Sequence, residues 1–559
     1  MLRSLMFVSG LFIAALANAS PIDDRASAKA LFDAGDWPHA IARYREIVER
    51  DPDHGEDHLR LGQALAKVGR CAEALAELKS AIRLGADGER SGLRRAHVES
   101  ARCDAALGRN DDAISELAIA KDRLGFDSFD ELAKDPSFAK ISATAAFKSL
   151  AAEPDKSLDR NAAWRADLAY FDNLVRRRHP NPFHQVSERT WIASVASLNH
   201  RIPQLSDLAI IGEFMRLGAS ISDGHTEIIP PLEGPRAFHL LPIWPYRIGS
   251  GWYVLAASPQ YRDLIGSRIE KIDGRPMADV ERGMRAIVPG DNDRSFGFVG
   301  VVALQFLELD ELAAAAKPSA SLSLTVDDPA KGPRSVELPG TAIDRDPTLP
   351  WPPADWPSFA SSTPLWLAHS SDAFHVEALD GGATVYAQVN RIEDSPAGSF
   401  RKFANDLGRR LKGPEVRRLI VDLRHNNGGS GGLNWTLVRE IVQATAISRP
   451  GGIFVITGPR TFSAAMNLAS MLETHTPAIF VGEATGSRPN FYGEDTSFVL
   501  PNSRLTGSIS SAWFQGGTTS DDQRPFIAPD LPASFTIEDL QSGRDPALEA
   551  IEAYAREHE

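Results

Sequence analysis

Cysteine is nearly absent from this 559-residue sequence, which contains only Cys71 and Cys103. Two thiols alone cannot hold a structural zinc ion, and prolines between His179 and His184 exclude a helical pair of histidine ligands. We therefore expect no metal site and no cofactor. Both cysteines fall in a repetitive helical region, where stacking of the repeats could bring them together. In an oxidising compartment they are predicted to form one disulfide.

Positive charge is also scarce. The sequence has 60 Lys and Arg against 74 Asp and Glu, a net charge of −14 and a pI near 5.5. Because no basic cluster stands out, nucleic-acid binding is not expected. After the first 19 residues no apolar stretch reaches transmembrane length, so we expect no stable membrane span.

The first 19 residues predict a targeting signal rather than a structural element. Met1 to Ala19 contains Arg3, an apolar run over 5–17, and an Ala-Asn-Ala end. This pattern is typical of a cleaved secretory signal peptide. The sequence thus predicts an exported protein, periplasmic or secreted.

A helical repeat occupies residues 26–126. Gly35 and Ala40 recur 34 positions later as Gly69 and Ala74, and a third copy follows a slightly longer connection. A helix-turn-helix period of 34 resembles the tetratricopeptide repeat, whose stacked units commonly bind peptides or partner segments. We predict a region that recruits a substrate or protein partner; a plain helical spacer is the alternative.

The remaining sequence predicts a multidomain α+β fold. Between the repeats and a C-terminal α/β core, strand-like runs and a turn resembling that of PDZ modules indicate a β-rich insert. Such an insert would offer a sheet edge to a peptide or merely brace the core. Alternating strands and helices in the core favour a largely parallel sheet. The predicted segments are 127–160 (linker and cap), 161–235 (helical), 236–345 (β-rich, PDZ-like), 346–358 (Pro-rich linker) and 359–545 (α/β core).

Ser463 stands at a predicted strand-to-helix turn. The β-branched run 453–456 is broken by Gly458-Pro459, and apolar residues then recur at helical spacing. A hydroxyl at a helix start lies beside unpaired N–H groups and the positive end of the helix dipole, which would stabilise an oxyanion. A simple N-cap is the alternative.

Two further motifs follow neighbouring predicted strands. The strand 416–424 ends in DLR and continues as HNNGG, and the strand 478–482 continues as EATG. The order DLRxNxGG, TxSAA and VGExTG resembles the C-terminal processing (tail-specific) serine peptidases, over roughly residues 160–540. The resemblance implies Ser463 as the nucleophile. It implies oxyanion donors at Gly428, Gly429 and Ala464.

The general base distinguishes two branches of that family. Where the bacterial branch has a catalytic lysine, this sequence has Arg488, which cannot be deprotonated in a protein. The tricorn-core-like branch takes a histidine from a GDGHT-like motif, which here is SDGHT and implies His225; a turn histidine is the alternative. The third catalytic residue in that branch is an acid. The resemblance implies Asp522 for this role, with Asp521 as the fallback; an acid in a solvated loop, without a catalytic role, is an equally good alternative.

Together these features predict an exported serine endopeptidase that hydrolyses peptide bonds with a serine nucleophile and a histidine base. The alternative is a catalytically silent scaffold of the same fold that binds peptides or another ligand. Retention of all three motifs favours the enzyme.

Overall fold

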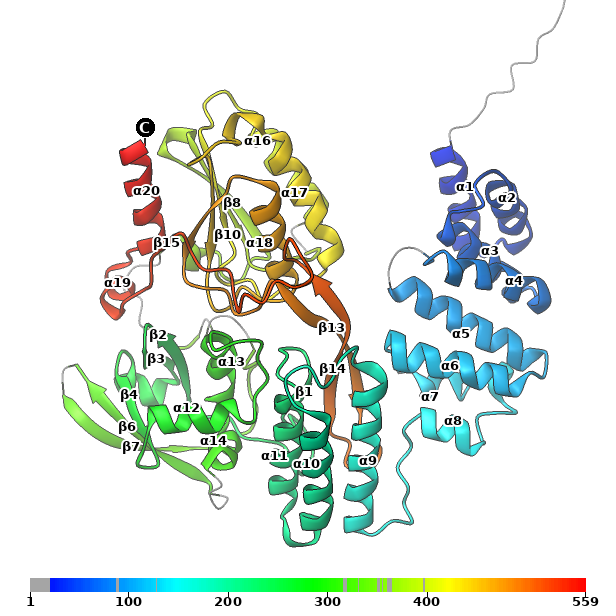
Figure 1. The fold of residues 1–559 in the computed structure, drawn as a ribbon, viewed down its shortest axis with the longest axis horizontal. Helices are drawn as coiled ribbons and strands as arrows, with labels where there is room; N and C mark the ends of the chain where they lie inside the picture. Colours follow the sequence, from blue (N-terminus) through cyan, green and yellow to red (C-terminus); the bar gives the residue numbers. More distant parts are fainter. Residues whose placement is uncertain are drawn as a thin grey trace, which may run out of the picture. The chain divides into compact units, whose positions relative to one another are not determined.

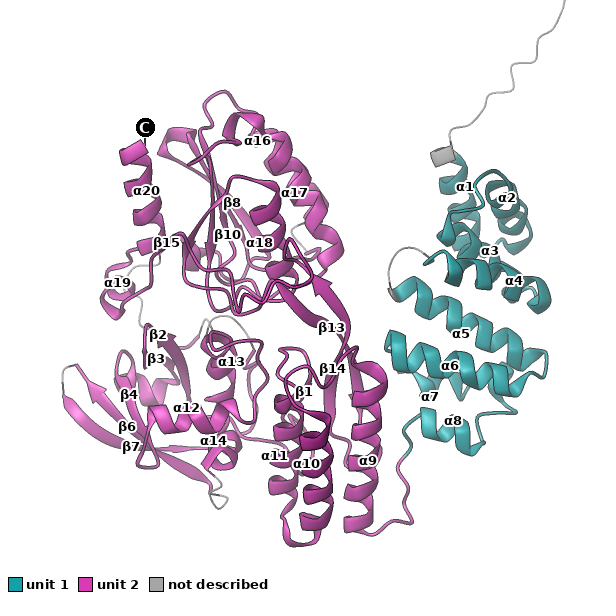
Figure 2. Cartoon of the chain, in the orientation of Figure 1, with its two compact units in different colours: residues 1–153 teal, residues 154–559 magenta. Residues whose placement is uncertain are grey.

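The computed structural model describes residues 21–86, 90–126, 128–314, 319–329, 331–348, 352–353, 355–358, 364–395 and 398–558. The signal peptide expected at 1–19 lies outside these residues. The chain divides into two compact units, residues 1–153 and 154–559 (Figure 2). Within the described ranges, no helix combines the length and the apolar character needed to cross a membrane.

Unit 1 is built from paired helices. Gly35, Gly69 and Gly108 occupy the turns within three successive pairs, with φ angles of 73°, 76° and 78°. Such left-handed angles strain any residue that carries a Cβ atom, which explains why glycine recurs there. The helices are α1 (Pro21–Asp33), α2 (Trp37–Arg50), α3 (Gly55–Lys67), α4 (Cys71–Arg83), α5 (Arg90–Ala106), α6 (Asn110–Leu124), α7 (Phe129–Leu132), η1 (Pro136–Phe138) and α8 (Ala145–Leu150).

The short helices α7, η1 and α8 follow the repeats. Phe129, Phe138 and Phe147 are at most 3% exposed and pack with Ala101 and Leu117 of the third pair. They therefore cover the apolar end of the repeat stack, as terminal caps of repeat arrays do.

The two cysteines of unit 1 are both buried and present as free thiols. Burial raises the pKa of the Cys103 thiol, and a hydrogen bond with Cys71 raises it further. The thiols are thus neighbours, and their oxidation to a disulfide stays a prediction.

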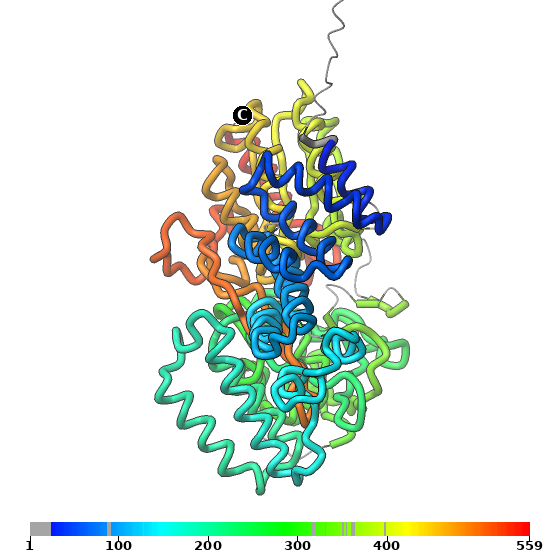
Figure 3. Tube along the Cα trace, turned by 90° about the vertical axis from the view of Figure 1, so that its right-hand side faces the viewer, coloured from blue at the N-terminus to red at the C-terminus, as the bar shows by residue number. Residues whose placement is uncertain are grey.

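Unit 2 begins with three helices that lie side by side in Figures 1 and 3. They are α9 (Arg160–Arg178), α10 (Glu188–Arg201) and α11 (Asp207–Ser220), the second extended by η2 (Ile202–Gln204). Asp159, Ser187 and Ser206 cap their N-termini by accepting backbone N–H groups. Because α11 ends at Ser220, it delivers the chain directly into the turn that holds His225.

A small antiparallel sheet joins this bundle to the C-terminal half of the chain. Its order is β1 (Glu227–Ile228), β14 (Thr506–Gln515) and β13 (Asn490–Val499). Phe171 of α9 packs on Phe498 of β13, with ring centroids 5.7 Å apart. The histidine turn itself is joined to β14, where the Ser508 hydroxyl donates to the carbonyl of His225 at 2.8 Å.

The β-rich region forms its own antiparallel sheet. The order is β2 (Ile243–Ile248), β3 (Gly251–Ala257), β4 (Arg268–Ile272), β6 (Ser321–Asp328) and β7 (Gly332–Pro339), and β5 (Arg275–Pro276) pairs with β4. Its helices are η3 (Pro259–Leu264), α12 (Met277–Arg285), α13 (Phe296–Ala303) and α14 (Leu307–Ala314).

The core sheet is parallel except at one edge. Its order is β15 (Leu531–Pro532), β12 (Ile479–Gly482), β11 (Ile453–Thr457), β10 (Arg418–Asp422), β9 (Thr384–Val389) and β8 (Phe374–Leu379), of which only the β8–β9 pair is antiparallel. The remaining elements are α15 (Leu365–Ala368), η4 (Asp380–Gly382), α16 (Phe400–Arg410), η5 (Gly431–Leu433), α17 (Asn434–Gln443), η6 (Thr445–Ile447), α18 (Ala464–His475), α19 (Ile537–Ser542) and α20 (Pro546–His558).

Alternate residues of the core strands face opposite layers. Val385 of β9 packs toward α16, α17 and α18, whereas its neighbour Tyr386 faces α20 (Figure 1). The predicted fold class is therefore confirmed: helical repeats, a β-rich insert, and an α/β core with a largely parallel sheet. The DLR, TFSAA and VGE motifs all lie at the carboxyl ends of parallel strands, the edge where open α/β sheets bind ligands.

Candidate active site

The turn between β11 and α18 is held in place by its own backbone and by β10. The Thr461 hydroxyl donates to the carbonyl of Leu423 at 2.9 Å and accepts the N–H of Gly458 at 3.1 Å. The N–H of Phe462 donates to the carbonyl of Asn426 at 3.1 Å. These bonds fix the residues on either side of the turn, which leaves Ser463 in a defined position at the helix start.

Ser463 has a strained backbone, and its side chain does not cap the helix. Its φ and ψ angles are 53° and −124°, a region that non-glycine residues seldom adopt, and its hydroxyl makes no capping hydrogen bond. Strain of this kind costs about 1–3 kcal/mol and persists where the surroundings impose it. The N-cap interpretation therefore does not describe this serine.

His225 supplies the partner of Ser463. Its Nε2 lies 3.0 Å from the Ser463 Oγ, although the two residues are 238 positions apart. The histidine is 9% exposed, and its ring is stacked between Phe462 and Phe491, with centroids 4.7 and 5.8 Å away. Packing on both faces restricts the imidazole to orientations close to this one.

Asp223 shapes the backbone that carries His225. Its Oδ1 accepts the N–H groups of His225 and Thr226 at 2.8 and 2.7 Å and the Ser510 hydroxyl at 2.7 Å. Its Oδ2 bonds the Nε2 of His179 at 2.9 Å. Burial alone would raise the pKa of Asp223, but these hydrogen bonds lower it below its usual range. The carboxylate is therefore charged and occupied, and its role is to fold the turn.

Asp291 is the buried carboxylate that acts electrostatically on His225. Its Oδ1 accepts the N–H of Gly224 at 2.7 Å, and its Oδ2 accepts the Ser487 hydroxyl. Burial raises the pKa of Asp291, and the charge of His225 opposes that rise. The Nδ1 of His225 is buried without a hydrogen-bond partner among the described residues. Sequence reasoning missed Asp291, whose only signal is a Gly-Asp-Asn turn in the insert.

Asp522, the predicted third catalytic residue, pairs with an arginine and not with His225. Its carboxylate accepts the guanidinium of Arg524 at 2.9 Å, and that guanidinium also pairs with Glu473. The hydrogen bond from Arg524 lowers the pKa of Asp522. The fallback Asp521 is exposed. The structure thus brings neither aspartate into hydrogen-bond contact with His225, because Arg524 satisfies Asp522 locally.

The three predicted oxyanion donors differ in whether their N–H groups are already hydrogen-bonded. The N–H of Gly428 donates to the Asn426 side chain at 2.8 Å. The N–H groups of Gly429 and Ala464 have no acceptor in the described part of the chain. A Cβ atom at Gly428 would lie 2.8 Å from the Ser463 Cβ, so this glycine allows the loop to approach the serine. The N–H groups of Gly429 and Ala464 therefore stay available to an acceptor.

Arg488 stands where the bacterial peptidases that the motifs resemble have a lysine. Its Nε donates to the backbone carbonyl of Asp291 at 2.8 Å. The guanidinium therefore anchors the loop that carries Asp291.

A cavity of about 500 Å³ opens in front of Ser463 and His225. Its wall is mostly apolar and comes from the insert and the histidine turn: Ile228, Val288, Val299, Val302, Phe306 and Leu309. Glu227 and Asp495 are its acidic residues, and no lysine or arginine lines it. Burial raises the pKa of Glu227 to about 7, and the charges of Asp495 and Asp223 contribute.

One cluster among the described residues could hold a metal ion. The ligand atoms of His369, Asp372 and His375 lie within 4.8 Å of one another. The two imidazoles are stacked in parallel, with centroids 3.4 Å apart, so their ring nitrogens do not converge on one point. None of the three lines the cavity of Ser463.

Comparison with known proteins gives a repeat family and distant structural neighbours. A tetratricopeptide repeat model matches residues 25–89, which confirms the predicted repeats. No curated protein matches the chain. The TPR2B domain of yeast Sti1, in a complex with pHsp70, is 22% identical, covering 23% of this chain and 92% of that chain, with a TM-score of 0.17.

Two neighbours span most of the chain. Mature CPAF complexed with lactacystin is 13% identical, covering 71% of this chain and 97% of that chain, with a TM-score of 0.49. The photosystem II D1 C-terminal processing protease is also 13% identical, covering 70% of this chain and 97% of that chain, with a TM-score of 0.34.

Proposed function

We propose that the protein is a serine peptidase in which Ser463 is the nucleophile and His225 the general base. The observation that carries this proposal is the 3.0 Å contact between the Ser463 Oγ and the His225 Nε2. A serine and a base within hydrogen-bond reach define an activated nucleophile. The strained start of α18 directs the hydroxyl toward the base rather than into the helix cap.

The reaction follows from these positions. Ser463 Oγ attacks the peptide carbonyl while His225 Nε2 takes its proton, and the resulting oxyanion meets the N–H groups of Gly429 and Ala464. His225 then returns the proton to the leaving amine. Water hydrolyses the acyl-serine ester with the same histidine as base.

Asp291 is our candidate for the acid that supports the imidazolium. The protonated ring needs a negative charge nearby, and the carboxylate of Asp291 is buried, hydrogen-bonded to Gly224 and electrostatically coupled to His225. Asp522 stays a prediction from the family pattern, since in this structure it is paired with Arg524. Asp291 therefore acts through His225 and does not touch substrate.

The cavity indicates the substrate class. Its apolar wall suits hydrophobic side chains of an extended peptide, and Glu227 adds a site that favours a basic side chain once it is ionised. The repeats are proposed to recruit the substrate or a partner protein, and export is proposed from the N-terminal segment.

The silent scaffold is the competing account, and one experiment separates the two. A fluorophosphonate probe should label the wild-type protein, and peptide mapping should place the adduct on Ser463. The Ser463→Ala protein is the matched control. A folded wild-type protein that stays unlabelled, with and without candidate peptide activators, would favour the scaffold.

A further inference from the structure

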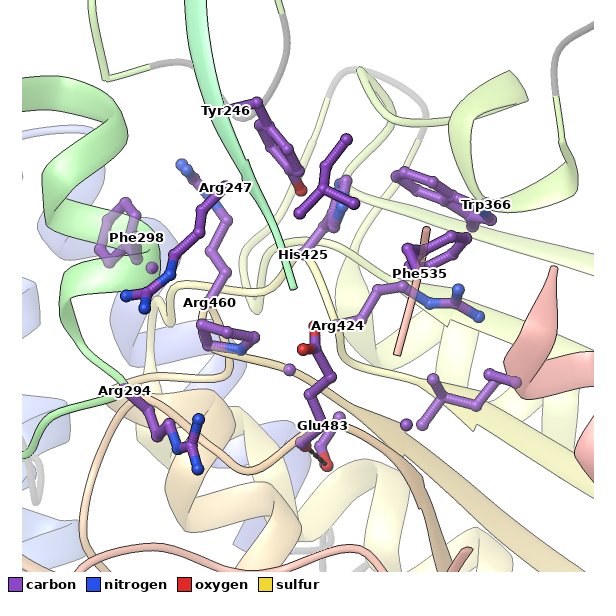
Figure 4. Close-up of a pocket in the computed structure, with 18 of the residues that line it drawn as sticks. Tyr246, Arg247, Arg294, Phe298, Trp366, Arg424, His425, Arg460, Glu483 and Phe535 are labelled. Carbon is purple, nitrogen blue, oxygen red and sulfur yellow. Dashed lines mark hydrogen bonds between the residues drawn. The ribbon is translucent and has the colours of Figure 1, made fainter. Parts of the chain in front are cut away.

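A second pocket of about 100 Å³ lies beside the catalytic cavity (Figure 4). Arginine side chains reach it from three separate segments: Arg247 from β2, Arg294 from the loop before α13, and Arg460 from the turn after β11. Phe298 lines both this pocket and the cavity of Ser463. The pocket is of a size suited to a small anion rather than to a peptide.

Arg460 is a buried cation that forms no ion pair among the described residues, although the charge of Asp346 acts on it. It is 9% exposed; its Nη2 donates to the carbonyl of Thr348 at 2.9 Å, and its guanidinium lies 4.3 Å from the centre of the Phe298 ring. Its Nε has no hydrogen-bond partner in the part of the chain that the structure describes. Burial lowers the pKa of Arg460 to about 10, so the group stays charged at neutral pH. A buried charge that no carboxylate contacts directly is costly, which favours the binding of an anion beside it.

The other two arginines are also weakly paired. Arg247 lies 3.9 Å from the carboxylate of Glu281, too far for a hydrogen bond. Arg294 is exposed, makes no ion pair within the described residues, and lies 5.7 Å from the ring centre of Phe526. Both side chains can therefore turn toward a ligand without breaking a strong contact.

Arg424 lines the same pocket, but its guanidinium is fully paired with carboxylates. Its guanidinium donates to both oxygens of Asp545 at 3.0 Å and to Asp422 at 3.0 Å. The chain thus neutralises this arginine with two buried carboxylates. It does not do the same for Arg460.

Glu483 is the only acid among the residues that line the pocket, and burial raises its pKa. It forms no ion pair in the described part of the chain. The residues between 348 and 364 that the structure does not describe contain no Asp or Glu. Three cationic groups therefore face one carboxylate.

We propose that this pocket binds a small oxyanion, a carboxylate or phosphate group, clamped by Arg247, Arg294 and Arg460. Planar guanidinium groups match the oxygens of such anions with paired N–H donors. The proposal concerns binding alone and does not depend on peptidase activity, so it can be tested in protein that lacks the Ser463 hydroxyl.

The test uses full-length Ser463→Ala protein titrated with sodium phosphate in a calorimeter, with chloride adjusted to constant ionic strength. We expect a saturable isotherm with one site per chain. Arg247→Gln/Arg294→Gln should weaken it by about tenfold or more, the scale of lost charge-assisted hydrogen bonds. Arg282→Gln is the matched control: this arginine is 76% exposed, pairs with Asp279 on α12, and should leave the isotherm unchanged.

Glu483→Gln changes the charge of the pocket in the opposite direction and removes no arginine. Loss of the one lining acid should tighten phosphate binding. No saturable binding to the parent protein, or equal affinity in the parent and the arginine variant, would overturn the proposal. Weaker binding in the Glu483→Gln protein would do so as well.

Competition identifies where the oxyanion comes from. The titration is repeated in the presence of a peptide with a free C-terminal carboxylate and, separately, of its C-terminal amide. Displacement of phosphate by the free acid alone assigns the pocket to a peptide carboxylate. Phosphate binding that neither peptide disturbs assigns it to free phosphate, and both results support an oxyanion site.

Discussion

Two neighbouring cavities of unit 2 share one phenylalanine and differ in charge. The cavity of Ser463 has Glu227 and Asp495 in its wall, and His225 is the one basic residue among its described lining. The pocket across Phe298 has four arginines and one glutamate. Because charge that the protein leaves unpaired selects a ligand of opposite sign, the first cavity suits neutral or basic side chains and the second suits an anion.

The turn after β11 contributes to both cavities within four residues. Arg460 faces the anion pocket and Ser463 faces the peptide cavity. A single backbone segment, anchored through Thr461, thus places the charged Arg460 in one cavity and the hydroxyl of Ser463 in the other. Variants of each side should therefore affect one property and spare the other.

The largest effect is expected from Ser463→Ala. Removing the nucleophile of a serine–histidine pair typically lowers the rate by several orders of magnitude, about 10⁶-fold in the best-studied case. Probe labelling and peptide cleavage should vanish while phosphate binding in the arginine pocket persists. Cleavage at the wild-type rate by the alanine protein would refute the role of Ser463.

Ser463→Gly sharpens the same comparison through stability. Glycine adopts a φ of 53° without strain, whereas alanine does not. The glycine variant should therefore be inactive but more stable than the alanine variant, by about 1 kcal/mol. Chemical denaturation of the two proteins measures the difference, and equal stabilities would show that the backbone at this residue is not strained.

His225→Ala should be next in size. Without a base the hydroxyl of Ser463 stays protonated, so kcat should fall by at least about 10³-fold. Arg488→Lys is the companion variant, because Arg488 only anchors the Asp291 loop and its replacement should not create a lysine-type pH profile. Full activity of the His225→Ala protein would reopen the search for the base.

The sequence predicts those parts of the site that local motifs determine. Ser463, His225 and the glycine loop each follow a predicted strand or helix, and the motifs alone are enough to locate them. Asp291 could not be predicted, because it reaches Gly224 across 67 residues from an insert whose pattern is weak. The family pattern points to Asp522, but Arg524, only two residues away, donates to its carboxylate. Pairing across long separations decides which acid lies near the histidine turn, and no local pattern encodes that choice.

Asp291→Asn and Asp522→Asn compare the two candidate acids directly. If Asp291 supports the imidazolium, its amide variant should lower kcat by about tenfold to a thousandfold, less than the 10⁴-fold seen when a directly bonded triad aspartate is replaced. It should also alter the pH profile of kcat while KM changes little. Asp522→Asn should stay near wild type, since only its contact with Arg524 is lost. The reverse ranking would restore the family assignment.

The smallest effect is expected from Glu227→Gln, and it concerns the charge that distinguishes the two cavities. The folded-state pKa of Glu227 is about 7, above its ordinary value of 4.5. The folded protein therefore retains a proton that the unfolded chain releases, and stability falls as pH rises from about 4.5 through about 7. The glutamine variant lacks this loss, so its advantage over wild type in unfolding free energy should grow between pH 5 and pH 8, by about 1–3 kcal/mol. The same ionisation should make wild type prefer a lysine-containing peptide over its norleucine analogue more strongly at pH 8 than at pH 5.

The Glu227→Gln protein should lose that pH dependence, and its phosphate binding across Phe298 should stay unchanged. If the preference for lysine is independent of pH in both proteins, Glu227 does not set the charge of the cavity.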